Sequence, residues 1–217
     1  MSIRRHTLPV IRTARYFTFG EAGPQTEVLW LACHGYGQLA SDFIHKFQVL
    51  DASRNLVVAP EGLSRFYWNG VQGKVGASWM TREERLDEIA DYVRYLQNLF
   101  DHFRAQLRPD LRIVLMGFSQ GCATICRWAL QNHPPFHHLF LWAGLLPDDL
   151  DYRAHQDYLA DKDLHFVYGL EDEYLTPERL EWHEGFVREQ GLPFQVTTFS
   201  GKHEVNREVL ADFADRL

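Results

Sequence analysis

The sequence predicts an α/β fold, with a mostly parallel central sheet of about seven strands flanked by helices. Short apolar runs recur along the chain and mostly end at glycine or proline, as strands buried on both faces do. Segments with apolar residues every three or four positions lie between these runs, and this alternation is typical of parallel βαβ units. Because no repeat, low-complexity segment or linker divides the chain, we expect a single domain over residues 1–217.

Seven segments are expected to form the strands. Residues 12–19 alternate in polarity and suit an outer antiparallel strand, and residues 194–199 suit a more polar strand near the end of the chain. The apolar runs between them suit buried strands: 28–33, 56–59, 111–116, 139–142 and 164–168.

The longest expected helix covers residues 82–104, with Thr81 as its N-cap. Its apolar residues recur at helical spacing, so that one face should pack on the core: Leu86, Ile89, Val93, Leu96 and Phe100.

Three further helices are expected where start and stop signals bound an apolar pattern. Residues 120–132 end at His133-Pro134-Pro135, because proline cannot donate a helical hydrogen bond. Residues 177–190 follow Thr176 as N-cap, begin with proline at the first helical position and end before a glycine. Residues 205–217 form the last helix.

Composition and charge exclude several classes of protein. Hydrophobic residues at 46% and charged residues at 24% match soluble globular proteins and exclude disorder. With a net charge of −7, the chain lacks the cluster of basic residues that binding to nucleic-acid phosphates requires. No apolar stretch follows Arg4-Arg5 to form a secretory signal, and the longest apolar run, 139–147, is about half a membrane span. We therefore expect a cytoplasmic protein with no nucleic-acid partner and no integral membrane segment.

The strongest chemical signal is Gly117-Phe118-Ser119-Gln120-Gly121. A bare G-x-S-x-G pattern arises by chance in about one chain in ten or fifteen of this length, but here it follows the expected strand 111–116 and opens the helix 120–132. That context predicts a nucleophile elbow, in which the serine hydroxyl stands above the sheet. The alternative is a plain strand–helix turn capped by Ser119.

A serine nucleophile needs a general base that is oriented by a carboxylate. Asp172 follows the strand 164–168 and His203 follows the strand 194–199, in the chain order that this elbow requires. The carboxyl ends of parallel strands meet at one edge of a sheet, so we expect both side chains near Ser119. The alternatives are a turn carboxylate for Asp172 and a surface histidine for His203.

Two backbone amides are expected to bind the developing oxyanion. One belongs to Gln120, directly after the nucleophile, and the other to Tyr36 in the glycine-rich segment after the strand 28–33. His34 also lies near the site, but it precedes the serine in the chain. A buried histidine in a His-Gly turn more often holds the loop by hydrogen bonding.

These motifs resemble the phospholipase/carboxylesterase family of α/β-hydrolases from about Val28 to the C-terminus. The segments that carry the resemblance are His34-Gly35-x-Gly37, the Gly-Phe-Ser-Gln-Gly elbow, Gly144-Leu145-Leu146-Pro147, and Gly169-x-x-Asp172 with His203. The resemblance implies an α/β-hydrolase fold, a triad of Ser119, Asp172 and His203, and an oxyanion hole formed by the backbone of Tyr36 and Gln120.

The sequence departs from the family at three places near the expected pocket. Cys122 stands where the family usually has a small residue such as glycine, and Gln38 replaces a common aspartate. Ser78-Trp79-Met80 replaces a segment that usually contains Trp-Phe or Trp-Tyr. None of these positions belongs to the expected triad, but each could reshape the substrate pocket.

Redox and metal chemistry are the weaker interpretations of the cysteine and histidine pairs. Cys122 and Cys126 share one helix face without forming a C-x-x-C motif, so buried thiols are expected. His137-His138 lacks further ligands at metal-binding spacing. We therefore expect neither a metal nor another cofactor.

The expected substrate is a small-molecule ester. Residues 61–80 form a long expected loop with many aromatic residues, and long loops in compact domains are usually functional. The side chains expected to contact substrate are Phe66, Trp79, Leu146 and Leu175. The segment 148–163 is short and highly charged, so no large lid is expected.

Three functions are compatible with this site. The first is a carboxylesterase for short-to-medium acyl esters, and the second is an acyl-protein thioesterase or lysophospholipase with the same triad. The third is a non-catalytic hydrolase-fold binding module, which the ordered Ser, Asp and His disfavour. The sequence does not define an oligomeric state.

Overall fold

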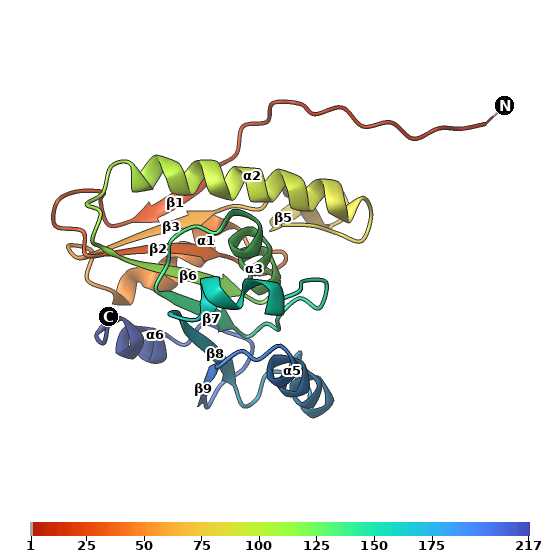
Figure 1. Ribbon diagram of the computed structural model, residues 1–217. Coiled ribbons are helices and arrows are strands. Elements are labelled where there is room, and N and C mark those ends of the chain that lie inside the picture. Colours follow the sequence, from red (N-terminus) through yellow and green to blue (C-terminus); the bar gives the residue numbers. More distant parts are fainter. Residues whose placement is uncertain (1) are drawn as a thin grey trace.

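A seven-stranded sheet runs through the protein in the computed structural model, which describes residues 2–217 (Figure 1). The strands in spatial order are β1 (Tyr16–Phe19), β3 (Asn55–Pro60), β2 (Val28–Cys33), β6 (Arg112–Phe118), β7 (His138–Trp142), β8 (Asp163–Gly169) and β9 (Gln195–Phe199). Strand β1 is antiparallel to β3, and every other neighbouring pair is parallel. The predicted mostly parallel α/β sheet, with an antiparallel outer strand, is confirmed.

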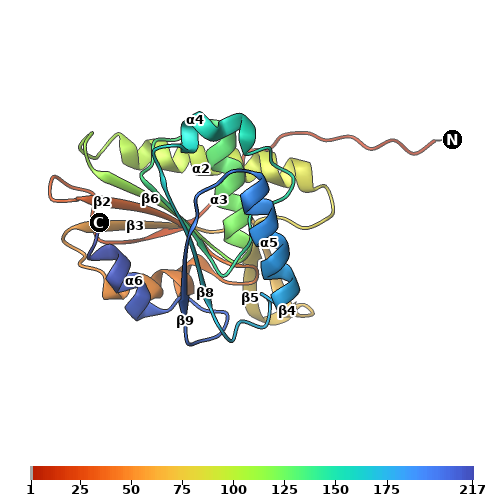
Figure 2. The same cartoon turned by 60° about the horizontal axis from the view of Figure 1, so that its bottom comes forward.

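Helices cover both faces of the sheet (Figures 1 and 2). On one face lie α2 (Arg85–Arg104), α3 (Gln120–Asn132), α4 (Gln156–Leu159) and α5 (Pro177–Glu189); on the other lie α1 (Ala40–Phe43), the 3₁₀ helix η1 (Ile44–Val49) and α6 (Arg207–Ala214). Strand β2 contributes side chains to the cores on both faces of the sheet, because successive side chains point to opposite faces. Leu29 and Leu31 join the core beneath α2 and α3, whereas Val28 and Trp30 join the core beneath α1 and α6.

The first turn of α2 differs from the prediction. The helix begins at Arg85, after Glu84 in a left-handed conformation (φ +51°), and Thr81 does not cap it. Instead, the Thr81 amide donates to Glu88 Oε2 at 2.6 Å. Leu86 was expected on the buried face, but it lies in the first helical turn and is 74% exposed. The predicted bounds of α3 are confirmed, and α5 begins with Thr176 as its N-cap.

The last helix is also shorter than the predicted 205–217. Asn206 caps it, because its side-chain oxygen accepts hydrogen bonds from the amides of Glu208 and Val209. Val205 lies outside the helix and is buried in the core.

Residues 61–80 contain a β-hairpin where a loop was expected. Strands β4 (Ser64–Asn69) and β5 (Gln72–Ser78) pair as a separate two-stranded sheet, with Phe66 opposite Gly76. Gly70 takes φ +68° in the turn between them. The Asn69-Gly70 pair is the sequence signal that predicts such a turn.

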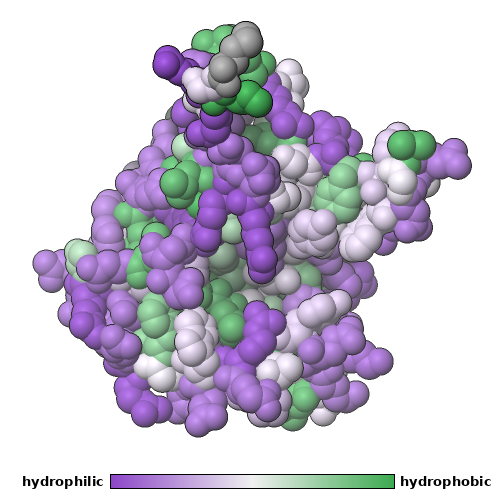
Figure 3. All heavy atoms as spheres, turned by 90° about the vertical axis from the view of Figure 1, so that its right-hand side faces the viewer, coloured by the Kyte–Doolittle hydropathy of each residue, from purple (hydrophilic) through white to green (hydrophobic). Residues whose placement is uncertain are grey.

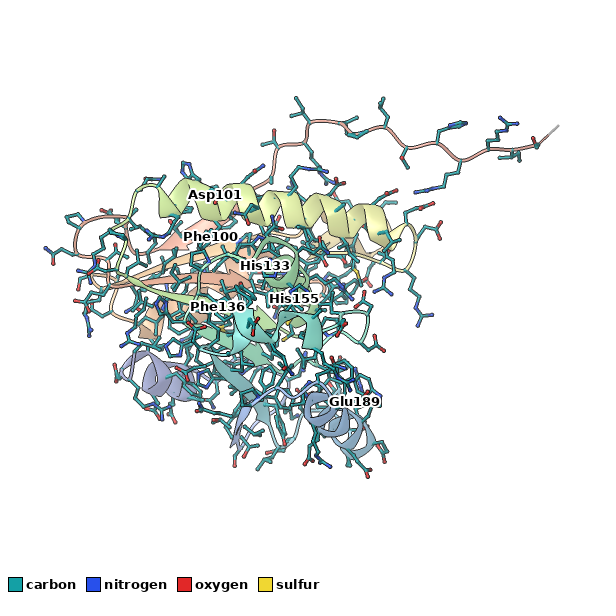
Figure 4. All side chains as sticks on the ribbon, in the orientation of Figure 1. Phe100, Asp101, His133, Phe136, His155 and Glu189 are labelled. Carbon is teal, nitrogen blue, oxygen red and sulfur yellow. The ribbon has the colours of Figure 1, made fainter. Side chains whose placement is uncertain are left out.

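The segment 148–163 contains only short helical elements, and no lid is built from it. These are the 3₁₀ helix η2 (Arg153–His155) and α4. Figure 4 shows His133 beside His155, and His133 Nε2 lies 2.8 Å from His155 Nδ1. Arg153 pairs with Glu189 at 3.0 Å. The segment is therefore fixed to the ends of α3 and α5.

Residues 2–15 form neither a helix nor a strand, and the first part of this segment extends away from the sheet (Figure 1). At its end, Arg15 packs on the domain, where its guanidinium donates to Glu61 Oε2 at 3.0 Å. Arg5 contacts Glu84 and Asp87 at the start of α2. Among the helices of residues 2–217, none combines the length and the apolar character needed to cross a membrane.

Candidate active site

Ser119 occupies the sharp turn between β6 and α3. Its backbone has φ +53° and ψ −116°, which is a strained conformation for a residue with a side chain. A Cβ atom on Gly117 would lie 2.4 Å from the carbonyl oxygen of Gly121, and one on Gly121 would lie 2.2 Å from that of Cys33. Only glycine fits at either position, and the turn has the elbow geometry that the sequence predicts.

Two loops pack directly against this turn. A Cβ atom on Gly144 would lie 2.4 Å from the Ser119 carbonyl oxygen, and one on Gly35 would lie 3.1 Å from Ser119 Cβ. The loops that follow β2 and β7 therefore meet the serine at the carboxyl edge of the sheet. Figure 3 looks onto this end of the molecule and shows apolar side chains in a hollow with polar borders.

Asp172 and His203 form a hydrogen-bonded pair at the same edge. The distance from Asp172 Oδ2 to His203 Nδ1 is 2.7 Å, and the Asp172 side chain is 1% exposed. Asp172 Oδ1 accepts a hydrogen bond from the Tyr174 amide at 2.8 Å. The carboxylate is thus fixed on both oxygens, and it orients the imidazole through Nδ1.

The His203 ring lies beside the elbow. Its centroid is 5.0 Å from that of Phe118, the residue before Ser119, and 4.6 Å from that of Tyr174. Within the part of the chain that the structure describes, no hydrogen bond joins His203 to Ser119 Oγ. Such bonds often tighten only when substrate binds.

The amides of Tyr36 and Gln120 donate no hydrogen bond within residues 2–217. Their neighbours do: the Gly35 amide donates to Gln38 Oε1 at 3.0 Å, and the Gly37 amide donates to the Ala77 carbonyl oxygen at 2.8 Å. Gln120 is also the first residue of α3, where the helix dipole favours negative charge. Both amides are available to an anionic oxygen.

His34 holds the loop after β2 and is fully buried. Its Nδ1 lies 2.7 Å from the Gly35 carbonyl oxygen, and its Nε2 accepts from the Gly62 amide at 3.0 Å. Burial lowers the pKa of His34, which favours the neutral ring that this pattern requires. Because both ring nitrogens are engaged by backbone, His34 has no nitrogen free to act as a base.

The sequence model of the phospholipase/carboxylesterase family matches residues 19–217. This chain belongs to that family. It is therefore a hydrolase that acts on ester bonds. No curated protein matches the sequence.

Solved structures agree with the family in their fold. Acyl-protein thioesterase 2 of Zea mays is 14% identical and superimposes with a TM-score of 0.70 over 94% of this chain and 97% of that one. The carboxylesterase of Mesorhizobium loti is 16% identical, with a TM-score of 0.69 over 93% and 94% of the two chains. The carboxylesterase of Bacillus cereus is 14% identical, with a TM-score of 0.61 over 94% of each. These matches establish the α/β-hydrolase fold.

The Gln120 side chain joins the elbow of this family member to the segment after β5. Its Oε1 accepts from the Trp79 amide at 3.1 Å, and its Nε2 donates to the Met80 carbonyl oxygen at 2.9 Å. His183 of α5 plays a similar part for the loop after β7, since its Nε2 accepts from the Leu146 amide at 3.1 Å. Sequence reasoning missed both side chains, because no local pattern indicates partners that lie 37 to 41 residues away.

The four expected substrate contacts fall into two groups. Phe66 lies in β4, is half-buried and stacks on Tyr36 with a centroid distance of 5.2 Å. Leu146 is 3% exposed and belongs to the core, but it also lines a cavity of about 430 Å³ between the loop after β7 and α5. Trp79 and Leu175 are 1% and 6% exposed and belong to the core. Trp79 donates from its indole to the His34 carbonyl oxygen at 2.8 Å, so it supports the loop from behind.

The three cysteines are buried free thiols, as expected for Cys122 and Cys126. Cys122 Sγ donates to the Gly117 carbonyl oxygen at 3.0 Å, and burial raises the pKa of each thiol. His137 Nδ1 accepts a hydrogen bond from the Ile113 amide at 3.0 Å. In the described residues, no three His, Cys, Asp or Glu side chains converge to hold a metal ion.

Proposed function

We propose that this protein hydrolyses carboxylic esters of short-to-medium acyl chains through a covalent acyl-enzyme on Ser119. The observation that carries the proposal is the 2.7 Å hydrogen bond between Asp172 and His203 beside a serine in a strained elbow. The unengaged amides of Tyr36 and Gln120 support the same assignment.

Each residue has one role in the first half of the reaction. His203 Nε2 accepts the Ser119 proton as Oγ attacks the substrate carbonyl carbon. Asp172 holds the Nδ1–H tautomer and stabilises the imidazolium that forms. The amides of Tyr36 and Gln120 donate to the oxyanion of the tetrahedral intermediate. As the intermediate collapses, the ester C–O bond breaks and His203 returns the proton to the leaving alcohol.

Water completes the cycle. His203 takes a proton from a water molecule as the water oxygen attacks the acyl carbonyl carbon. The second tetrahedral intermediate releases the carboxylic acid, and the proton returns to Ser119 Oγ. No cofactor takes part in this sequence.

The cavity beside Leu146 supports the proposed acyl-chain length. Its volume of about 430 Å³ is small among ligand pockets, and two leucines and Trp182 contribute apolar lining. A thioesterase or lysophospholipase would use the same residues, and a chain-length series on matched oxygen and sulfur esters separates these functions. A cytoplasmic location remains our prediction from the sequence.

Ser119→Ala tests the mechanism directly. With 4-nitrophenyl butyrate, kcat/KM should fall by at least about 10³-fold, because the nucleophile is lost. Ser53→Ala, in an exposed turn after η1, is the matched control and should keep wild-type activity. A loss of less than about tenfold in Ser119→Ala would show that the serine is not the nucleophile.

Covalent labelling provides an independent readout. A fluorophosphonate should modify Ser119 in the wild-type protein, and peptide mass spectrometry identifies the site. A protein that binds but does not hydrolyse esters would leave Ser119 unlabelled, which would favour a non-catalytic binding module.

A further inference from the structure

The few lysines of this protein are unevenly placed around the candidate site. The chain has 22 basic residues, but only four are lysines: Lys46, Lys74, Lys162 and Lys202. Two of these, Lys46 from η1 and Lys74 from β5, line a single small pocket beside the loop that carries Tyr36. The protein as a whole is acidic, with a net charge of −7, so this pairing of positive charges is a local feature.

The pocket has a volume of about 200 Å³ and walls from three parts of the chain. Tyr36 and the two residues after it form one wall, and the hairpin contributes Trp68 together with Lys74. Helix α1 and η1 contribute Asp42 and Lys46. A carboxylate or a phosphate with a few attached carbon atoms fits this volume.

The hairpin wall is fastened to the loop that carries Tyr36. The Gly37 amide donates to the Ala77 carbonyl oxygen at 2.8 Å, and the Trp68 indole donates to the Gly37 carbonyl oxygen at 3.2 Å. The Trp68 ring also covers Gly37, where a Cβ atom would lie 2.1 Å from the ring. A group bound in the pocket is therefore next to the amide that faces the ester carbonyl in the proposed reaction.

Both lysines are free to meet an anion. Within residues 2–217, neither ammonium group lies within salt-bridge distance of a carboxylate, whereas Lys162 pairs with Asp161 at 2.6 Å. Lys74 Nζ is held 5.8 Å from the centroid of the Trp68 ring. The lining thus presents two ammonium groups and one carboxylate, that of Asp42. Such a cationic pocket attracts a negatively charged group and orients it.

The opposite side of the site has the opposite charge. The cavity beside Leu146 is lined by Asp148 and Glu178, with Arg179 as its only cation among the described lining residues. The Arg179 guanidinium donates to the Tyr174 carbonyl oxygen at 2.6 Å. A negatively charged substituent is therefore directed away from this cavity and toward the lysines.

We propose that the pocket formed by Tyr36, Trp68, Lys46 and Lys74 binds an anionic group, a carboxylate or a phosphate, that the ester substrate carries. Lys46 and Lys74 are then the residues that determine specificity for charged esters. This inference rests on the proposed function, since it concerns the substrate that Ser119 attacks.

Pairs of esters with and without a negative charge test the inference. Monoethyl glutarate and ethyl glutaramate differ by a charge on the acyl side, and acetoxyacetate and acetoxyacetamide differ by a charge on the alcohol side. A third pair, 1-butyryl-glycerol 3-phosphate and monobutyrin, tests a phosphate. In at least one pair, wild-type kcat/KM should be about tenfold or more higher for the anionic ester, as expected for a charged hydrogen bond. Added salt should reduce that ratio.

Lysine variants then locate the preference. Lys46→Gln and Lys74→Gln should each lower the anionic-to-neutral ratio about threefold, and the double variant should abolish it. Asp42→Asn should raise the ratio, because it removes the opposing charge. Lys162→Gln removes the same charge at the amino end of β8 and should leave the ratio unchanged. Lys46→Arg and Lys74→Arg keep the charge and should retain most of the preference. Their activity also shows that substitution at these positions does not prevent folding.

The outcomes separate this inference from the proposed function. If Ser119-dependent hydrolysis continues but the wild type shows no preference, or the double lysine variant keeps it, the anionic pocket is wrong and the esterase assignment stands. If no ester is hydrolysed in a Ser119-dependent manner, the proposed function itself fails.

Discussion

The floor and the walls of the candidate site are built from different parts of the polypeptide. We define the floor as residues 34–37, 117–121 and Gly144, where backbone packs on backbone so closely that a Cβ atom on several glycines would meet main-chain oxygens within 2.5 Å. The walls are the β4–β5 hairpin and α5. Their surfaces are side chains, among which Trp68 and Trp182 are 45% and 47% exposed.

This difference separates chemistry from recognition. The groups proposed to act on the ester carbonyl are the backbone amides and the serine, and the close packing of the floor fixes their positions. The groups that would select a substrate stand on exposed side chains, which can change without disturbing that packing. Substitutions in the floor should therefore act on folding and activity together, whereas truncation of the exposed side chains of the walls should act mainly on activity.

The largest effect is expected from adding one methyl group to the floor. Gly121→Ala places a Cβ atom 2.2 Å from the Cys33 carbonyl oxygen, so the free energy of unfolding should fall by about 3 kcal/mol or more. The matched control is Gly185→Ala in α5, where a Cβ atom meets nothing within 4 Å. It should stabilise the protein by about 0.5–1 kcal/mol, because alanine favours the helix.

Denaturant unfolding of both variants measures this contrast. Wild-type stability of Gly121→Ala would show that the backbone of the floor can move to accept a methyl group. The proposed difference between floor and walls would then be wrong.

Lowering the pH should reduce the contribution of His183 in α5 to the free energy of unfolding. Burial lowers the pKa of His183 to about 4 from 6.5 in the unfolded chain, so the unfolded state binds a proton more readily between these values. The contribution of His183 to the free energy of unfolding is complete above pH 6.5 and falls by about 3 kcal/mol as the pH drops to 4. Protonation would also remove the acceptor for the Leu146 amide.

His183→Gln tests this effect, because glutamine offers an acceptor but does not titrate. Denaturant unfolding at a series of pH values should show a shallower loss of stability in His183→Gln than in the wild type. His6→Gln, in the exposed N-terminal segment, controls for the loss of one histidine. Parallel pH curves for the wild type and His183→Gln would refute the prediction.

A smaller effect is expected where a wall touches the floor. Trp68→Ala removes the indole that covers Gly37 and donates to its carbonyl oxygen. The loop that presents the Tyr36 amide should loosen, and kcat on a neutral ester should fall about tenfold, which corresponds to about 1.4 kcal/mol. Thermal unfolding should change little, because Trp68 is half-exposed.

Tyr67→Ala is the matched control for this variant. Tyr67 is the preceding residue of β4 and is 48% exposed, and its side chain points to the other face of the hairpin. Equal kinetic effects of the two substitutions would show that the hairpin does not position the loop through Trp68.

Much of the fold was predictable because the sequence carries strong local signals. The six apolar residues of β2 are buried on both faces, and α3 starts at the elbow and stops at a pair of prolines. Apolar runs and helix-ending prolines act over a few residues, so they can be recognised in a single sequence. The start of α2 was missed because Thr81 has the residue type of an N-cap, whereas the helix begins after Glu84 in a left-handed conformation.

The pairing of Asp172 with His203 beside the β6–α3 turn was predictable from topology, since parallel strands bring their carboxyl ends together. The burial of Trp79 was not, because an aromatic residue in an apparent loop gives no sign of the carbonyl group that its indole reaches. The lysine pocket was also missed, since Lys46 and Lys74 come from distant segments that only the folded hairpin joins.

Under the proposed mechanism, the strained backbone of Ser119 sets stability against activity at a single position. A residue without a side chain would relax the turn, but it would also remove the hydroxyl group. Selection for a better-folded domain and selection for hydrolysis therefore oppose each other here. Stabilising substitutions elsewhere in the chain are the means by which evolution can keep such a serine in place.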